Sequence, residues 1–235
     1  MLYLTDNGEG ELSLSCDEDE FERVWRDYLD LEEDYSRIRG MIDRKSDPFL
    51  FDAACHEKGI RILRQDPWEA LISFIISQNR NIPAIKHSIE LLAEMAGEKL
   101  PDPAGGVCYA FPSPEAICAL SDGDLTDCRL GYRCCYVRKA AEDVLSGRID
   151  FAALSAEGDD ERCMEILMGM TGVGKKVASC MLLYGLHHMD AFPVDVWVKR
   201  ILEEYYPDGY DLERYRPYNG VFQQYMFAYY RSIKS

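Results

Sequence analysis

The sequence of 235 residues predicts a mostly helical fold, and three observations carry this prediction. Apolar residues recur at helical spacing over most of the chain. The pair Asp66-Pro67, ahead of one such stretch, is a strong signal for the start of a helix. The turn Gly172-Val173-Gly174 joins two further stretches with helical periodicity. With 47% hydrophobic residues, a chain of this length can bury a sizeable core.

The chain lacks the signals of a membrane or secreted protein. No stretch approaches the roughly 20 consecutive apolar residues that a transmembrane helix needs. The first seven residues hold neither a basic segment nor a long apolar one. We therefore expect a cytoplasmic protein, nucleoid-associated in a bacterium or archaeon, without membrane contact or secretion. The nine cysteines form no C-x-x-C pair, which favours buried reduced thiols over a metal site.

The charge balance argues against a conventional nucleic-acid binder. Lys and Arg number 26 against 42 for Asp and Glu, a net charge of −16, whereas proteins that bind DNA usually carry a basic face. The acidic residues concentrate in residues 17–34 and 156–161. The basic residues near the motifs described below are Lys175, Lys176, Lys199, Arg200, Arg133 and Arg138. This distribution predicts a local basic cleft on an acidic body, with weak non-specific affinity for DNA.

The first 62 residues predict a small hairpin followed by helices. Short strands are expected at residues 2–4 and 11–15, around the turn signal Asn7-Gly8. An acidic helix start follows Cys16. The apolar face expected for that helix consists of Phe21, Val24, Trp25, Tyr28 and Leu29. A further helix is expected through Tyr35, Ile38 and Ile42.

The next helix has the clearest start in the chain, because Asp66 can cap it and Pro67 suits its first position. Its apolar stripe consists of Trp68, Leu71, Ile72, Ile75 and Ile76, so we expect it in the core. It should end within residues 77–83. Helices are then expected over residues 84–98, from Ser113, and over residues 139–146, 160–169 and 217–232, with a loop at residues 102–106.

The most informative stretch spans residues 165–200. Residues 163–169 predict a helix, two glycines permit a tight turn, and a second helix begins at Lys175 or Lys176. The second helix carries Val177, Cys180, Met181 and Tyr184 at helical spacing. A helix–hairpin–helix of this kind exposes unpaired N–H groups at a helix N-terminus, which suits a phosphate.

Two ionisable residues near the hairpin indicate chemistry. Lys176 falls in the first turn of the second helix, where the positive end of the helix dipole favours a neutral, nucleophilic amine. Asp195 follows Phe192-Pro193-Val194 and precedes a periodic apolar stretch, so it should cap or begin the next helix. A lysine nucleophile and a carboxylate around a phosphate-binding hairpin suggest a reaction on a nucleotide sugar.

These residues together resemble the helix-hairpin-helix (HhH-GPD) DNA glycosylases. The pattern Gly172-Val-Gly-x-Lys176-Val-Ala-x-Cys180, followed by Pro193-Val-Asp195-Val, looks like the 8-oxoguanine DNA glycosylase branch. The resemblance implies two helical lobes flanking a DNA cleft. It places the glycosylase domain at residues 63–235, with its hairpin at about 163–186. Residues 1–62 would be a remnant of the family's β-containing N-terminal domain.

The implied activity is that of a bifunctional DNA glycosylase and abasic-site β-lyase. It would remove oxidised purine, 8-oxoguanine, from double-stranded DNA in base excision repair. Lys176 would form the Schiff base, and Asp195 would be the essential aspartate. No cysteine follows Cys180, which argues against the endonuclease III and adenine-glycosylase branches with their iron–sulfur cluster. We expect no cofactor or metal and a monomer.

The resemblance also assigns roles around the flipped base. Asn79 would fill the gap that the base leaves, Tyr132 would wedge into the stack, and Arg133 would contact the orphaned cytosine. The lesion base would lie in a pocket of Cys180, Gln223 and Phe227. The remaining expected DNA contacts are Gly172, Gly174 and Trp197. Core or surface roles without DNA remain open for Asn79, Arg133 and Phe227.

Two departures from the family pattern bear on specificity. The family has an arginine after the asparagine that fills the gap, and the matching position here is Ala84, which predicts relaxed discrimination for the opposite cytosine. A glycine carbonyl of the family's N-terminal domain recognises the protonated N7 of 8-oxoguanine, and residues 1–20 offer no counterpart. Two alternatives are a non-catalytic DNA-binding module and an alkyl-purine glycosylase of the same fold. A DNA-binding module needs neither Lys176 nor Asp195, and the alkyl-purine glycosylases share the aspartate but lack the lysine.

Overall fold

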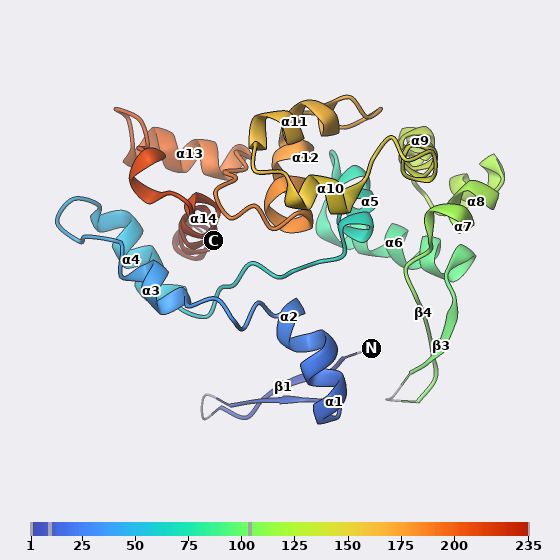
Figure 1. The fold of residues 1–235 in the computed structure, drawn as a ribbon, viewed down its shortest axis with the longest axis horizontal. Helices are drawn as coiled ribbons and strands as arrows, with labels where there is room; N and C mark the ends of the chain where they lie inside the picture. Colours follow the sequence, from blue (N-terminus) through green and yellow to red (C-terminus); the bar gives the residue numbers. More distant parts are fainter. Residues whose placement is uncertain (1, 9–10, 103–104, 235) are drawn as a thin grey trace.

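The computed structural model describes residues 2–8, 11–102 and 105–234 and has a mostly helical fold. Figure 1 shows two groups of helices, one containing α5 to α9 and the other containing α3, α4, α13 and α14, with α10 to α12 beside them. The predicted fold class, two helical lobes with a small β-containing N-terminal part, is confirmed. Among the described residues, no helix is both long and apolar enough to cross a membrane.

The chain begins with the predicted hairpin. Strands β1 (Leu4–Asp6) and β2 (Leu12–Leu14) pair antiparallel, so the first strand lies slightly later than expected. A helix then runs through α1 (Glu18–Glu20), the π-helical η1 (Phe21–Trp25) and α2 (Arg26–Tyr28), and Asp17 caps it. The predicted apolar face of this helix is only partly covered, since none of its residues is buried.

The first lobe begins with the most apolar helix of the chain. Asp66 caps α5 (Pro67–Ser77) by accepting a hydrogen bond from the backbone N–H of Glu69, and every residue of the predicted stripe is buried. The other elements of this lobe are α6 (Ile82–Ala96), β3 (Lys99–Pro101), β4 (Val107–Tyr109), α7 (Pro114–Ala119), α8 (Asp122–Asp127), η2 (Gly131–Arg133) and α9 (Cys134–Leu145).

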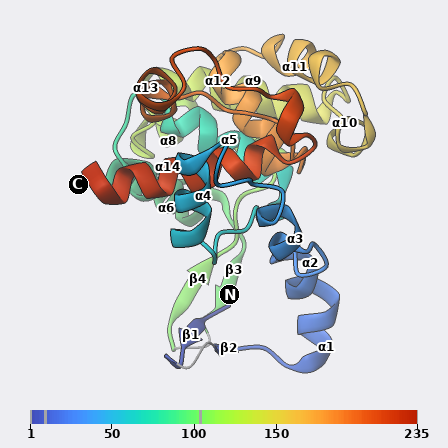
Figure 2. The same cartoon turned by 90° about the vertical axis from the view of Figure 1, so that its left-hand side faces the viewer.

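One prediction for this lobe was incomplete. Strands β3 and β4 form an antiparallel hairpin around the loop expected at residues 102–106, of which residues 103–104 lie outside the described part. The Tyr3 hydroxyl donates to Asp102 Oδ1 at 2.6 Å, so this hairpin meets the N-terminal one, as Figure 2 shows. Each strand has only three residues, too few for a periodic pattern to stand out in the sequence.

The second lobe surrounds the C-terminal helix. Its elements are α3 (Tyr35–Arg39), α4 (Pro48–His56), α10 (Phe151–Ala156), α11 (Asp160–Met168), α12 (Lys175–Cys180), η3 (Met181–Gly185), α13 (Val196–Tyr205), η4 (Glu213–Tyr215) and α14 (Asn219–Lys234). Helix α14 packs along α4, which brings the N-terminal part of the chain against its C-terminal helix (Figure 2). Ile42 was expected within the same helix as Tyr35 but lies beyond the end of α3.

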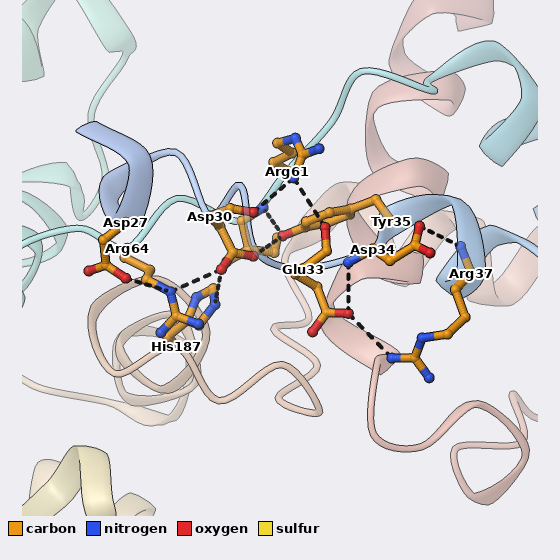
Figure 3. Close-up of polar contacts among 10 residues, drawn as sticks. Asp27, Asp30, Glu33, Asp34, Tyr35, Arg37, Arg61, Arg64 and His187 are labelled. Atoms are coloured by element: carbon orange, nitrogen blue, oxygen red, sulfur yellow. Dashed lines mark hydrogen bonds and ion pairs between the residues drawn. The ribbon is translucent and has the colours of Figure 1, made fainter. Parts of the chain in front are cut away.

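A buried polar network ties residues 30–64 to the loop after η3 (Figure 3). The Asp30 carboxylate is 1% exposed, and it accepts hydrogen bonds from Tyr35 Oη at 2.8 Å and Arg64 Nε at 2.9 Å. His187 Nε2 lies 3.2 Å from the same carboxylate. Burial alone raises the pKa of Asp30, but the hydrogen bonds from His187 and Tyr35, with the charge of Arg64, outweigh it and lower the pKa.

Candidate active site

The hairpin between α11 and α12 positions Lys176. Gly172 has φ +84°, and a Cβ there would lie 2.4 Å from ring atoms of Tyr136, so this position requires glycine. Gly174, by contrast, has φ −94° and open space around it, so only one of the two glycines is needed for the turn. Because Gly174 is the N-cap of α12, Lys176 lies in the first turn of the helix, with an exposed side chain.

Asp195 is the N-cap of α13, as predicted. Its Oδ1 accepts hydrogen bonds from the backbone N–H groups of Trp197 at 2.9 Å and Val198 at 2.8 Å. An N-cap carboxylate fixes its own orientation through these bonds and satisfies two otherwise unpaired donors. The helix cap uses one oxygen of Asp195, so the second oxygen is not committed to the helix.

Lys176 and Asp195 line the same two hollows. The larger is an open cleft of about 660 Å³ between the end of α5 and the N-termini of α12 and α13; Ser77, Asn79, Gly174, Trp197 and Lys199 also line it. The smaller is a cavity of about 140 Å³, whose other lining residues include Phe74, Cys180, Tyr184, Gln223, Gln224 and Phe227. The amine and the carboxylate therefore lie where the cleft and the cavity meet.

The small cavity brings together all three residues predicted for a base pocket, Cys180, Gln223 and Phe227. Burial raises the pKa of the Cys180 thiol to about 11, although the charge of Lys176 lowers it. The thiol is therefore neutral near pH 7 and serves as an apolar wall rather than as a nucleophile. Gln223 is 3% exposed and its Nε2 donates to the Pro193 carbonyl at 3.0 Å.

The predicted wedge residues meet at the rim of the cleft. Asn79 follows α5 with φ +53°, a left-handed conformation that asparagine tolerates, and its Nδ2 donates to Tyr132 Oη at 3.3 Å. Tyr132 is 51% exposed, and the Arg133 guanidinium lies 4.3 Å from the centre of its ring. Arg133 itself is 5% exposed and donates to the carbonyls of Gln78 and Leu130, so it is not a solvated surface arginine.

The predicted basic cleft is correct only in part. Lys176 and Lys199 line the open cleft, and Arg200 lies over the Trp197 ring at 5.2 Å. Arg133 is buried. Arg138 is wrong as a cleft residue, because its guanidinium donates to the carbonyls of Cys118 and Leu120 and pairs with Asp122. Both arginines hold the fold of the first lobe together instead of adding positive charge to the cleft.

Sequence reasoning gave no pocket role to four residues of the small cavity, Phe74, Tyr184, Pro193 and Gln224. Tyr184 follows Cys180 by four residues, so helical spacing already placed it on the same face. Phe74 occurs within the core stripe of α5, and Gln224 follows Gln223 directly; neither has a signal that separates it from its neighbours.

Comparison with known proteins gives two family matches. The family model of the 8-oxoguanine DNA glycosylase N-terminal domain matches residues 5–71, and that of the HhH-GPD superfamily base excision DNA repair proteins matches residues 72–212.

Two curated relatives match part of their own length. A probable N-glycosylase/DNA lyase of Methanothermobacter thermautotrophicus is 31% identical over 200 residues, which cover 76% of this chain and 62% of that protein. The N-glycosylase/DNA lyase of Saccharomyces cerevisiae is 34% identical over 159 residues, covering 63% of this chain and 42% of the yeast protein. The chain thus spans less than two thirds of these relatives.

Solved structures agree over the whole chain. Clostridium acetobutylicum 8-oxoguanine glycosylase/lyase, in complex with double-stranded DNA containing cytosine opposite 8-oxoG, superposes with a TM-score of 0.89 at 34% identity, covering 100% of this chain and 82% of that one. MBOgg1 in complex with a low-affinity DNA ligand gives a TM-score of 0.90 at 36% identity, covering 100% and 83%. An Archaeoglobus fulgidus 3-methyladenine DNA glycosylase, at 21% identity and a TM-score of 0.70 over 94% of this chain and 79% of that one, shares the fold alone.

Proposed function

Because the chain belongs to the HhH-GPD superfamily of base excision DNA repair proteins, we propose that it is a bifunctional DNA glycosylase and abasic-site β-lyase that removes 8-oxoguanine from double-stranded DNA. One observation carries the proposal. Lys176 and Asp195 line both an open cleft of about 660 Å³ and a smaller cavity of about 140 Å³ beside it. An extruded nucleotide would place its base in the cavity and its sugar beside the amine and the carboxylate.

The rim of the cleft supports base extrusion. The first-turn amides of α12 are suited to a backbone phosphate, which would fix the register of the DNA. Asn79 and Tyr132 touch each other at the rim and would fill the vacancy in the stack. Arg133 is 5% exposed and bonded to the carbonyls of Gln78 and Leu130, so contact with the orphaned base would require its side chain to move toward the cleft.

The chemistry follows from the two residues at the junction. Asp195 stabilises positive charge on the sugar as the C1′–N9 bond breaks and its electron pair leaves with the base, which is then protonated. The neutral amine of Lys176 attacks C1′ and loses its protons as the ring opens to a Schiff base. Removal of a C2′ proton then expels the 3′ phosphate, with cleavage of the C3′–O bond.

The base cavity supports a flat, partly polar guest. Cys180 and Phe227 provide its walls, and Gln223 provides hydrogen-bonding groups for the Watson–Crick edge. Ala84 lies where the family has an arginine for the opposite base, so we propose relaxed discrimination among opposite bases. We further propose a monomer acting on DNA in the cytoplasm or nucleoid, with the glycosylase domain beginning at residue 63, in the irregular segment between α4 and α5.

Borohydride trapping tests the proposal directly, because it captures the Schiff base as a covalent protein–DNA adduct. The substrates are duplexes with 8-oxoguanine opposite each of the four bases, a duplex with an abasic site, and undamaged DNA. We expect adducts with the 8-oxoguanine and abasic duplexes. The adducts should be absent in Lys176→Gln and retained in Lys175→Gln. Lys175 is the matched control, because its substitution removes the same charge one residue away and its side chain lines neither the cleft nor the cavity.

Each result has a definite meaning. Trapping with all four opposite bases supports the role given to Ala84. Trapping on abasic DNA alone rejects 8-oxoguanine as the substrate but keeps the lyase. Binding of DNA without any adduct rejects the catalytic proposal in favour of a DNA-binding module.

A further inference from the structure

We propose that Gln224 is a specificity-determining residue: it fixes the amide orientation of Gln223, so that the cavity accepts a guanine-type 8-oxopurine and rejects an adenine-type one. The inference rests on the proposed function and deepens it, because it concerns how the cavity reads its base. Gln224 would touch no reacting atom, so it is a positioning residue.

The backbone engages the NH2 half of the Gln223 amide. Its Nε2 lies 3.0 Å from the Pro193 carbonyl oxygen. A carbonyl can only accept a hydrogen bond, so the NH2 group and not the oxygen of the amide must face Pro193. The side chain is 3% exposed, so solvent does not compete for this position.

Gln224 fixes the other half of the same amide. Its Nε2 donates to Gln223 Oε1, which is the only amide atom of Gln223 that can accept. The two adjacent residues of α14 both line the small cavity. Turning the Gln223 amide by 180° would break both hydrogen bonds at once. It would place the Gln223 oxygen against the Pro193 carbonyl oxygen and the Gln223 NH2 group against the NH2 group of Gln224.

Tyr184 shares the wall of the small cavity with Gln224, and the interaction of the two side chains is the smallest of the effects on the pKa of Tyr184. The Tyr184 ring lies against Phe74, with ring centroids 5.7 Å apart. Burial raises the pKa of Tyr184, so its hydroxyl stays neutral and the pair adds no charge to the cavity. The hydrogen bonds from the Pro193 carbonyl through Gln223 to Gln224 thus form one connected set in the cavity wall that Tyr184 shares.

The groups that remain free on Gln223 define what it can read. After these two bonds it keeps one N–H donor and one oxygen lone pair, side by side and in a fixed order. A guanine-type edge presents an acceptor, O6, beside a donor, N1–H; an adenine-type edge presents a donor beside an acceptor. A freely turning amide can match both edges, whereas a fixed amide matches one and leaves buried groups unpaired with the other.

The test compares excision of 8-oxoguanine with that of 8-oxoadenine in otherwise identical duplexes. Gln224→Met keeps the size of the side chain and removes its polar groups; Gln224→Glu keeps the shape and replaces the donor by an acceptor. We expect both to lower the 8-oxoguanine preference about tenfold or more, with a smaller loss in Tyr184→Phe. Trapping on the abasic duplex, which has no base to read, should stay within about twofold of wild type.

A matched control is Tyr229→Phe, which removes a hydroxyl from the same helix outside the cavity. It should leave the preference unchanged. An unchanged preference in both Gln224 variants, even with slower excision of both lesions, would overturn the inference, since a merely structural residue would slow both alike.

A second measurement separates this inference from the proposed function. Calorimetric binding of free 8-oxoguanine and free 8-oxoadenine needs no chemistry. Selective binding that Gln224→Met abolishes would support the inference even if the wild type trapped no DNA, a result that rejects the proposed function. Equal binding of the two bases by wild type would overturn the inference, whatever the trapping shows.

Discussion

The two ends of the second hairpin helix, α12 continued by η3, differ in how far their polar side chains are paired within the protein. At the N-terminal end, Lys176 is exposed at the junction of the cleft and the cavity and, within the described part of the chain, forms no ion pair. Beyond the C-terminal end, Asp30 is buried beside the partly buried His187, and it accepts hydrogen bonds from Tyr35 and Arg64 as well (Figure 3). One helix thus connects a site with unused hydrogen-bonding capacity to a site that has almost none.

The difference separates groups that are available to the proposed substrate from groups that stabilise the fold. A charged group without a protein partner can interact with a bound ligand. A buried carboxylate whose oxygens both accept hydrogen bonds instead links segments of the protein to one another. Substitutions at the cleft end should therefore change activity more than stability, and substitutions at the Asp30 end should do the reverse.

The largest expected effect is on activity, from Asp195→Asn. The asparagine oxygen can still cap α13 by accepting from Trp197 and Val198, but the negative charge that the proposed mechanism uses is lost. We expect excision of 8-oxoguanine to fall by about 10² to 10³-fold, the usual cost of removing one preorganised electrostatic stabiliser. Single-turnover excision kinetics measure the fall.

The free energy of unfolding of Asp195→Asn separates the loss of charge from the loss of the helix cap. Asp195→Asn should unfold within about 0.5 kcal/mol of wild type, whereas Asp195→Ala should lose about 1 kcal/mol more through the missing cap. An Asp195→Asn variant with normal excision would show that Asp195 serves only the helix.

The second effect is on stability, from Asp30→Ala. The change removes the shared acceptor of Tyr35, Arg64 and His187 and puts alanine at φ +51°. We expect a loss of about 2 to 4 kcal/mol in the free energy of unfolding, measured by urea denaturation. Abasic-site trapping per folded molecule at 25 °C should match wild type. A stable variant with poor trapping would mean that the network shapes the active site.

The third effect tests the turn that precedes the N-terminal end of the helix. In Gly172→Ala the new Cβ meets the Tyr136 ring at 2.4 Å, and the backbone stays in the left-handed region. We expect about 1 to 3 kcal/mol lower stability and weaker DNA binding. Gly174→Ala is the matched control, because its Cβ would meet nothing within 4 Å and φ is −94°, so its stability should be unchanged. Equal losses in both variants would contradict the assignment of the turn to Gly172.

Local signals predicted what local structure decides. The Asp66-Pro67 start, the Asp195 cap and the hairpin were all correct because a cap and its helix lie within four residues of each other. The same signal, Asp47-Pro48, begins α4 and was overlooked, and α10 also escaped prediction. These misses reflect how the sequence was read, since Asp47 carries the same information as Asp66.

Tertiary packing decided the rest. No local pattern distinguishes buried Arg133 from a solvated arginine, because its partner, the Gln78 carbonyl, comes from another helix. The engagement of Gln224 with Tyr184 likewise depends on how α14 packs beside η3. Residue positions carried over from the family resemblance placed Cys180, Gln223 and Phe227 around one cavity, which periodicity alone would have left as core.

The smallest effect is the pH dependence of the free energy of unfolding in acid. We expect a contribution from Asp30, at one end of the helix, and none from Lys176, at the other. The folded state holds the pKa of Asp30 below its ordinary value: burial opposes this, but the hydrogen bonds from His187 and Tyr35 and the charge of Arg64 prevail. A lowered pKa means that the unfolded chain binds the proton more readily than the folded one. The Asp30 contribution is therefore fully present above the unfolded pKa of about 4 and is lost as pH falls through the lower folded value.

Urea midpoints measured from pH 7 down to the acid limit of folding test this sign. Wild type should lose stability below about pH 4 more steeply than Asp30→Asn, which has no carboxyl at this position to titrate. Lys176→Gln should follow the wild-type curve, because Lys176 lies at the other end of the helix and forms no ion pair among the described residues. If the urea midpoints of Asp30→Asn and wild type fell equally with decreasing pH, the charge of Asp30 would contribute nothing to stability. The network would then stabilise the N-terminal segment through packing and hydrogen bonds alone.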